Sequence, residues 1–391
     1  MKNILFVLPS LTIGGLERVQ VTLANALAKA GHNVTVITFD EGEDLAKELL
    51  PEVTFRHVRP KPHPIMQKIP YVRDKFYDSG LWETRASAKE LYRYYVGKEQ
   101  YDVEIAFFRG RSVKIISGST NPNSVKLAWV HNDYTKCGGV TANFKSLDDL
   151  KKAYKAFDGI VAVSKEAAEK FRIAIGYAGS VSVLYNPIPA EEILHKATEP
   201  CELKKDRFTV VAVGRLVQQK GFDRLVDAFV AAKKKTKKDA ALWIVGEGED
   251  RPMLEQKISE SGDPSIRLLG AKTNPFPYMA QTDLCVCSSR FEGFNLTVAE
   301  ALILGKPVLS TVCTGPCEIL EDGKYGLLCE NSTEGLTDAL SAIFSDPEKL
   351  DSYRALAAER GKFFNADRVA GTLLELLKQF PENPIQEGSK A

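Results

Sequence analysis

The chain has 391 residues, of which 44% are hydrophobic and 26% are charged, as in an ordinary globular protein. Its formal net charge of +1 excludes a general attraction to nucleic acid, so any role of charge has to be local. The apolar run near the start covers only residues 4–8 and ends at Pro9, too short for a signal-peptide core or a membrane span. No run of 18 apolar residues occurs elsewhere, so we expect a cytoplasmic protein without a transmembrane segment.

Short apolar runs alternate with helical patterns along the first half, which predicts a parallel sheet with helices between its strands. The clearest helix covers residues 16–30 and stops at Gly31. Its apolar residues recur every three or four positions, as expected of a helix that packs on a sheet. The predicted strands are residues 4–8, 34–39, 53–58, 103–107, 126–130, 159–163 and 181–184.

A change in composition then interrupts this pattern. Residues 185–189 contain two prolines and residues 191–206 are mostly polar, which together predict a linker. The pattern restarts with a helix at residues 223–232 and strands at 209–213, 242–245, 266–269, 284–286 and 308–309. We therefore predict an α/β protein of two doubly wound domains, residues 1–188 and 200–365, with a disordered tail beyond Pro381.

Seven cysteines are present, an odd number without C-x-x-C pairs or nearby histidines, which argues against a zinc site. Cys285 and Cys287 alternate with apolar residues on a predicted buried strand, where a thiol behaves as a small hydrophobe. We expect reduced, structural cysteines at all seven positions, which are Cys137, Cys201, Cys285, Cys287, Cys313, Cys317 and Cys329.

The stretch RFEGFNLTVAEALILGKPVL, residues 290–309, is the most informative part of the chain. It sets Glu292 and Glu300 on either side of a predicted helix start, with a helical apolar pattern that ends at Gly305. Amides at a helix start attract an anion such as phosphate, and Glu300 would lie about 6 Å further along. Carboxylates there would accept hydrogen bonds from hydroxyls at both ends of a nucleotide diphosphate sugar.

This stretch resembles the acid, seven residues, acid signature of the retaining glycosyltransferases of family 4. The resemblance places Glu292 toward the donor sugar and Glu300 toward the ribose. It implies the GT-B fold, in which two Rossmann-like domains face each other across a cleft and the last helix, residues 367–380, crosses back to the first domain. The similarity continues through GGLER (14–18), VHND (130–133), GRLVQQKG (214–221), GEGED (246–250) and GPCEILEDGKYGLL (315–328).

The family places Arg215 and Lys220 on the diphosphate of the donor. Both residues follow a predicted strand, where ligands of doubly wound sheets bind. Each charge-assisted hydrogen bond would contribute about 1.5–3 kcal/mol and would stabilise charge on the departing nucleotide. Without the family context, an Arg and a Lys in a loop would be read as solvated.

His131 follows the strand at residues 126–130, at a place where the family has a histidine near the reacting centre. We assign it no role as a base, because in such enzymes the leaving phosphate is thought to help deprotonate the acceptor. A structural histidine is the alternative.

Gly14 and Gly15 would let the backbone approach a ligand, or would only form a tight turn. A dinucleotide site with Asp40 as the ribose acid lacks the G-x-G-x-x-G spacing.

The candidate residues fall into two groups. The catalytic candidates are Arg215, Lys220, Glu292 and His131. The donor-binding candidates are Gly14, Gly15, Gly214, Gly246, Glu247, Arg267, Gly293, Phe294, Asn295, Leu296, Thr297 and Glu300. Asn295 departs from the family, where Pro, Gly or Ser is frequent, and we expect it to border the sugar. The sequence has no Asp-x-Asp, so we expect no metal and no cofactor besides the nucleotide sugar itself, which is a co-substrate.

Residues 56–98 carry ten Lys and Arg against four Asp and Glu, with aromatic and aliphatic residues between them. Such a surface could rest on anionic lipid at the inner face of the plasma membrane, where a polyprenyl-linked acceptor would be found. A solvated insertion is the equal alternative.

The sequence thus predicts a metal-independent retaining glycosyltransferase that moves a hexose from a UDP-sugar to a saccharide or lipid-linked saccharide. The expected role is polysaccharide synthesis, without nucleic-acid partners. Two alternatives stay open, a nucleotide-sugar epimerase of the same architecture and a nucleotide-sugar binding protein without activity.

Overall fold

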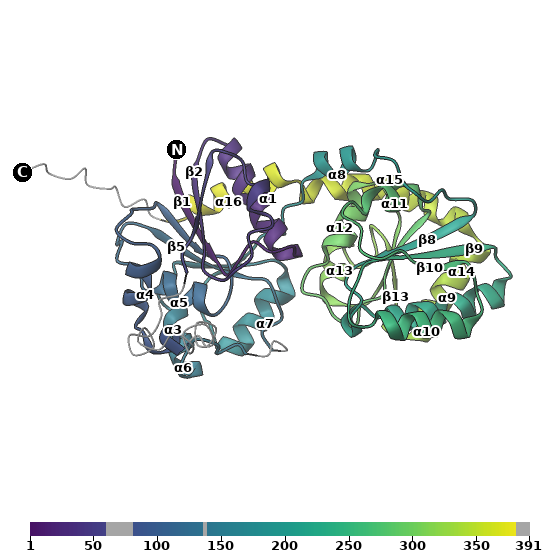
Figure 1. Cartoon of the computed structure of the whole chain (residues 1–391), viewed down its shortest axis with the longest axis horizontal. Coiled ribbons are helices and arrows are strands. Elements are labelled where there is room, and N and C mark those ends of the chain that lie inside the picture. Colours follow the sequence, from purple (N-terminus) through teal and green to yellow (C-terminus); the bar gives the residue numbers. More distant parts are fainter. Residues whose placement is uncertain (60–80, 136–138, 381–391) are drawn as a thin grey trace, which may run out of the picture. The chain divides into compact units, whose positions relative to one another are not determined.

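Every apolar run predicted to be a strand forms one in the structure, a computed structural model that describes residues 1–59, 81–135 and 139–380. The strands build two separate parallel sheets, and the chain divides into two compact units (Figure 1). The first unit is Met1–Pro187 together with the chain from Ala366 onward, and the second is Ile188–Asn365. The predicted α/β class with two doubly wound, Rossmann-like domains is confirmed.

Some predictions lie outside the described residues. The tail beyond Pro381 and Cys137 are not covered. Of the basic and aromatic region at residues 56–98, residues 60–80 are not covered either.

The sheet of the first unit has the strand order β3-β2-β1-β4-β5-β6-β7, with all neighbours parallel. Residues 4–8 of β1 are each 0% exposed, as expected of a central parallel strand with helices on both faces. The strands are β1 (Asn3–Leu8), β2 (Asn33–Thr38), β3 (Val53–His57), β4 (Val103–Ala106), β5 (Val125–Val130), β6 (Gly159–Ala162) and β7 (Val181–Val183). The helices are α1 (Gly15–Lys29), α3 (Leu81–Arg85), α4 (Ala88–Tyr95), α5 (Arg111–Ser117), α6 (Leu147–Tyr154), α7 (Lys165–Ile175) and α16 (Ala366–Leu377), with a 3-10 turn η1 (Ala46–Glu48).

The last helix returns to the first unit. The apolar face of α16, which includes Val369 and Leu373, is buried, and the helix packs on α1. Just beyond it, the ring of Phe380 lies so close to Gly159 in β6 that a Cβ there would come within 2.8 Å of it. The C-terminal segment is therefore part of the hydrophobic core of the first unit.

The sheet of the second unit has the order β10-β9-β8-β11-β12-β13, again all parallel. In Figure 1, α9, α10 and α14 cover one face of this sheet, and α8, α11, α12 and α15 cover the other. The strands are β8 (Phe208–Val213), β9 (Ala240–Val245), β10 (Ile266–Leu268), β11 (Leu284–Cys287), β12 (Val308–Thr311) and β13 (Leu327–Cys329). The helices are α8 (Ala190–Lys196), α9 (Phe222–Thr236), α10 (Arg251–Ser261), α11 (Phe276–Gln281), α12 (Leu296–Ile303), α13 (Thr314–Ile319), α14 (Thr333–Ser345) and α15 (Asp351–Gly361), with 3-10 turns η3 (Gln218–Lys220), η4 (Pro347–Leu350) and η5 (Lys362–Phe364).

Two features of the second unit differ from the prediction. Strand β13, the three residues Leu327–Cys329 at the edge of the sheet, was not predicted. The predicted linker at residues 191–206 was wrong in its first part, where α8 forms. Its mostly polar composition hides one buried contact: Ile193 is 1% exposed, and α8 packs on α11 and α12.

The predicted thiols of the second sheet are buried. Cys285 and Cys287 in β11 are 4% and 8% exposed, and burial raises the pKa of the Cys285 thiol to about 12. The cysteines within the described residues are free thiols.

Candidate active site

The strand order of the second sheet changes direction between β8 and β11. The chain runs outward from β8 through β9 to β10, and then returns to the other side of β8 with β11. Ligands of open parallel sheets bind at such a point, outside the carboxyl ends of the strands. The loops that leave β8 and β11 carry Lys220 and Glu292, so the topology brings these two candidates to one edge.

Lys220 and Glu292 form an ion pair at this edge. The Lys220 ammonium lies 2.6 Å from Oε1 of Glu292, and the hydroxyl of Ser289 donates to the same oxygen at 2.7 Å. The Lys220 side chain is 18% exposed and that of Glu292 is 7% exposed. A carboxylate withdrawn from water to this degree needs a partner of opposite charge, and Lys220 provides it.

Glycines let the neighbouring loops approach each other at backbone distance. Gly246, which follows β9, has a φ of 152°, and a Cβ there would lie 1.8 Å from the carbonyl oxygen of Gly214. Gly221, directly after Lys220, has a φ of 64°, and its Cβ would lie 2.3 Å from the carbonyl oxygen of Ser288. Only glycine fits either position, so both residues are needed for the packing of the loops around the ion pair.

The predicted helix after Glu292 is confirmed as α12. Asn295 caps it: its Oδ1 accepts from the Val298 amide at 3.2 Å, and its Nδ2 lies 3.1 Å from Sγ of Cys287. The residue is 4% exposed. Both polar atoms of the amide bind within the protein, at the helix start and at the strand end. A position of Asn295 beside the sugar stays a prediction. Asn is a common helix N-cap because its side-chain oxygen accepts a hydrogen bond from a backbone amide of the first turn. The spacing of the residues in the motif does not reveal this role.

The remaining candidates of this stretch lie along the same turn and helix. Phe294 is 9% exposed, and its backbone lies against Gly315 of α13, where a Cβ would come within 2.7 Å of Phe294 Cα. Thr297 donates weakly to the carbonyl of Val213 at 3.4 Å, which ties α12 to the end of β8. Gly293, Leu296 and Glu300 are partly exposed.

Three further candidates are not members of the ion pair. Arg215 is exposed in the loop after β8. Glu247 is also exposed and forms an ion pair with Arg251. Arg267 lies in the edge strand β10, and its charge acts on Asp206, which precedes β8 at the opposite end of the strands. The structure therefore does not bring Arg267 to the loops that carry Lys220 and Glu292.

The candidates of the first unit lie at the carboxyl ends of its central strands, where the strand order changes direction between β1 and β4. Gly14 precedes α1 as its N-cap with an extended backbone and no side-chain cap, and Gly15 is the first residue of the helix. His131 directly follows β5. Its Nε2 lies 2.9 Å from the carbonyl oxygen of Phe107, the residue after β4.

His131 is held in its neutral form. Burial lowers its pKa to about 3, although the hydrogen bond to the Phe107 carbonyl acts in the opposite direction. A carbonyl only accepts, so the single proton of the neutral ring resides on Nε2, and Nδ1 carries a lone pair. The ring of Phe107 packs against the imidazole with a centroid distance of 4.7 Å. The side chain is therefore a fixed hydrogen-bond acceptor and a poor base.

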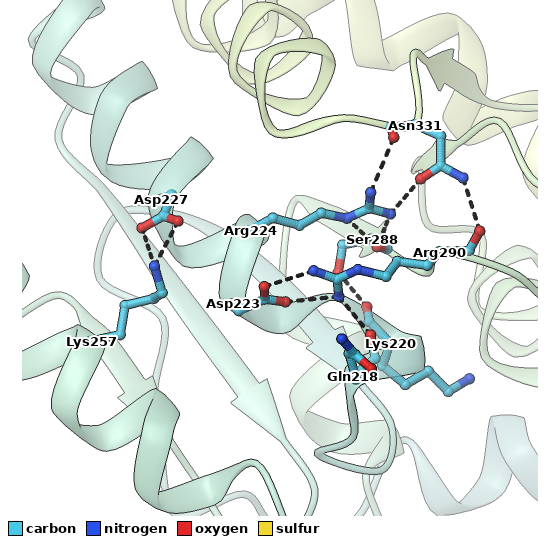
Figure 2. Close-up of polar contacts among 9 residues, drawn as sticks. All are labelled: Gln218, Lys220, Asp223, Arg224, Asp227, Lys257, Ser288, Arg290 and Asn331. Atoms are coloured by element: carbon cyan, nitrogen blue, oxygen red, sulfur yellow. Dashed lines mark hydrogen bonds and ion pairs between the residues drawn. The ribbon is translucent and has the colours of Figure 1, made fainter.

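Sequence reasoning missed a polar network behind the ion pair. Arg224, Ser288, Arg290 and Asn331 are joined there by hydrogen bonds, together with Asp223 (Figure 2). An arginine within the apolar pattern of α9 was a signal of this network, since Arg224 is only 7% exposed. In the part of the chain that the structure describes, no group of three or more His, Cys, Asp and Glu is placed to hold a metal ion. Among the described helices, none has the length and apolar character needed to cross a membrane.

The sequence matches two family profiles. Residues 13–102 match "Glycosyltransferase Family 4", and residues 207–346 match "Glycosyl transferases group 1". Solved structures with similar folds include Anabaena HepE in complex with UDP and glucose (TM-score 0.71, 19% identity, 97% of this chain and 100% of that chain). Another is sucrose-phosphate synthase of Thermosynechococcus elongatus (TM-score 0.75, 20% identity, 97% and 99%). These matches define the class as glycosyltransferases with the GT-B fold. The chain belongs to family 4 of that class, as the resemblance of its motifs predicted.

Curated relatives are similar over part or most of their length. An N-acetylgalactosaminyltransferase of Campylobacter jejuni, whose full name specifies a diphospho-undecaprenol acceptor, is 34% identical over 50% of this chain and 53% of that protein. The lipopolysaccharide core glycosyltransferase LpsE of Rhizobium meliloti is 27% identical over 53% of this chain and 60% of that protein. An uncharacterized glycosyltransferase of Haemophilus influenzae is 27% identical over 89% and 92%. The alignments with the first two thus span little more than half of those proteins.

Proposed function

We propose that the protein is a retaining glycosyltransferase that moves a hexose from a UDP-sugar to a saccharide acceptor during the assembly of a cell-surface polysaccharide. The observation that carries this proposal is the ion pair of Lys220 and Glu292, 2.6 Å apart at the point where the strand order of the second sheet changes direction. A cation and a carboxylate side by side match the two chemical parts of a nucleotide sugar, the anionic diphosphate and the hydroxylated ring.

In this proposal, donor binding redistributes the ion pair. The diphosphate attracts the Lys220 ammonium, and the Glu292 carboxylate then accepts hydrogen bonds from sugar hydroxyls. Arg215, exposed on the same loop, adds a second cation as charge develops on the departing UDP. The pairing without donor keeps both groups oriented and keeps the buried carboxylate compensated.

His131 contributes an acceptor to this reaction and no proton transfer. Its neutral imidazole has a lone pair on Nδ1, which would accept from a hydroxyl of the transferred sugar. A pKa of about 3 makes it unsuitable as a base near neutral pH. We therefore propose that the leaving phosphate takes the acceptor proton, with the new bond formed on the face that the phosphate leaves.

The names of similar proteins support the choice of substrates. HepE was crystallised with UDP and glucose, and the C. jejuni relative is named for a lipid diphosphate-linked saccharide. We propose an acceptor of that class, presented at the inner face of a membrane to a cytoplasmic enzyme. Contact between residues 56–98 and anionic lipid stays a prediction, to be tested by sedimentation with charged and neutral vesicles.

Incubation of the protein with a panel of UDP-sugars tests the proposal. We expect thermal stabilisation by one or a few donors, slow release of free UDP without acceptor, and faster release with a saccharide acceptor. Stabilisation without any UDP release would indicate a binding protein. Conversion of the donor into an isomeric UDP-sugar without UDP release would indicate an epimerase. Either result would overturn the proposed transfer reaction.

A further inference from the structure

We propose that Arg290, held by Asp223, is a positioning residue that fixes the loop of Lys220 against the loop of Glu292, and thereby sets the geometry of the donor site. The loop of Lys220 is defined as residues 217–221 and the loop of Glu292 as residues 288–292. The inference rests on the proposed function, because it concerns how the two proposed donor-binding groups are held.

Three successive carbonyls of the Lys220 loop accept hydrogen bonds from the Glu292 loop. The Gln218 carbonyl accepts from Nη1 of Arg290 at 2.6 Å, and the Gln219 carbonyl accepts from the Arg290 amide at 2.8 Å. The Lys220 carbonyl accepts from the Ser288 hydroxyl at 2.8 Å. Arg290 makes two of these three bonds. Each of the other links between the loops, which come from Ser288, Gln219 and the ion pair of Lys220 with Glu292, is a single contact.

Asp223 orients the guanidinium that makes this link. Nη1 of Arg290 lies 3.0 Å from Oδ1 of Asp223, and Nη2 lies 2.7 Å from Oδ2, which is a two-pronged pair (Figure 2). Asp223 is in the first turn of α9, so the link is anchored to a long helix. Burial acts to raise the pKa of Asp223, but the hydrogen bonds and charge of Arg290 outweigh it and lower the pKa.

These contacts distinguish Arg290 from Lys220 and Arg215, the two cations proposed to bind the diphosphate. Its charge is balanced by the carboxylate of Asp223, and both Nη atoms donate to groups of the protein. Lys220 is different, because its ammonium is paired with the group that the proposal assigns to the sugar. Arg290 thus acts on the donor through Lys220 and Glu292.

A second set of bonds holds the Glu292 loop from behind. Arg224 donates to the Ser288 carbonyl from Nε at 3.0 Å and from Nη2 at 2.6 Å, and Asn331 donates to the Arg290 carbonyl at 3.0 Å. The Glu292 loop is therefore fixed to the body of the unit. The Lys220 loop is attached to it through Arg290, through Ser288, through a bond from Nε2 of Gln219 to the Phe291 carbonyl at 3.0 Å, and through the ion pair with Glu292. Loss of the pair between Arg290 and Asp223 should loosen mainly the Lys220 loop.

The matched variants are Asp223→Asn, Arg290→Lys and the control Asp227→Asn. Asp227 lies one turn further along α9, and both of its oxygens accept from Lys257 at 2.7 Å, away from both loops (Figure 2). The control thus removes an ion pair from the same helix without touching the site. Arg290→Lys keeps the positive charge and loses the planar fork.

The first measurement is amide hydrogen exchange, which needs no ligand. We expect Asp223→Asn and Arg290→Lys to speed exchange of the Lys220 and Gly221 amides about tenfold. Asp227→Asn should leave these amides unchanged. Equal exchange in all variants and wild type would overturn the positioning role, whether or not the protein proves to be a glycosyltransferase.

The second measurement is a double-mutant cycle on UDP affinity and turnover. We expect Arg290→Lys to lower kcat about tenfold or more and to change KM less, because misplacement of a catalytic group affects the transition state most. In a Lys220→Ala background, Arg290→Lys should weaken UDP binding much less than it does in the wild-type background. If Arg290→Lys weakened UDP binding equally in both backgrounds, Arg290 would contact the ligand itself, and the inference would be overturned. Absence of UDP binding and turnover in wild type would instead count against the proposed function.

Discussion

The two units differ in the partner that each provides for an ionisable side chain at the edge of its sheet. His131, at the edge of the first sheet, is partly buried beside Phe107. Its ring donates to an uncharged carbonyl, and burial lowers its pKa. Glu292, at the edge of the second sheet, has a side chain that is 7% exposed and that forms an ion pair with the ammonium of Lys220. Desolvation removes charge from a group that lacks a counter-ion and is compensated where one is present. The candidate side chain of the first unit is thus a neutral hydrogen-bond acceptor, whereas that of the second unit is part of an ion pair.

The strongest way to break this comparison is to remove the counter-ion. Lys220→Ala should lower turnover by about 2–4 kcal/mol of transition-state stabilisation, which is roughly 30- to 10³-fold. It should also destabilise the fold by about 1–3 kcal/mol, because Glu292 loses its partner. Steady-state kinetics and urea unfolding measure the two effects.

Controls for this prediction come from the same loop. Arg215 is exposed, so Arg215→Ala should lower turnover without loss of stability. The double change Lys220→Ala with Glu292→Gln should regain much of the stability and none of the turnover. Wild-type turnover in a folded Lys220→Ala protein would remove this residue from the diphosphate site.

The two carboxylates of the helix region sharpen the comparison within the second unit. Glu300→Gln should weaken binding of free UDP about tenfold, since a charged acceptor for the ribose becomes neutral. Glu292→Gln should leave free UDP binding nearly intact and weaken the intact UDP-sugar. Calorimetric titration of both variants with both ligands gives four affinities. Equal loss of UDP affinity in the two variants would contradict this division of roles.

Acid titration tests the neutral state of His131. Its pKa in the folded protein is about 3, below the ordinary value of 6.5, so the unfolded chain binds the proton first. His131 therefore lowers stability progressively as the pH falls from about 6.5 toward 3, by about 2 kcal/mol at pH 5. His131→Gln keeps a donor for the Phe107 carbonyl and cannot be protonated, so its stability should fall less steeply in this range.

Unfolding in urea at several pH values measures this difference. The turnover of wild type should show no titration of His131 between pH 5 and 8. Identical pH dependence of stability in wild type and His131→Gln would show that the histidine is accessible to protons in the folded state.

The smallest expected effect is that of chelation. If Lys220 and Arg215 supply the positive charge for the departing UDP, EDTA should change turnover only modestly. Loss of transfer with EDTA and recovery with magnesium or manganese would mean that a metal ion supplies this charge. The difference between the neutral His131 of the first unit and the ion pair of the second unit would then apply only to the protein without bound donor.

Most residue types of the candidate site could be predicted from the sequence, whereas few of the contacts between these residues could. The motifs identified Lys220 and Glu292, but the 2.6 Å pair joins residues 72 positions apart. Asn295 was recognised as unusual, yet its function as a helix cap follows from backbone geometry at the start of α12. Arg290 lay inside the most informative stretch and received no role, because its partner Asp223 belongs to another loop and helix.

The periodicity of apolar residues determined the strands, the parallel sheets and the two units, because burial of alternating or continuous apolar runs is a local property of sequence. Tertiary structure decided which charged groups meet, because β11 returns beside β8 and brings two distant loops to one edge. It also decided the charge state of His131, since desolvation depends on everything packed around a group and leaves no trace in the residues beside it in the chain.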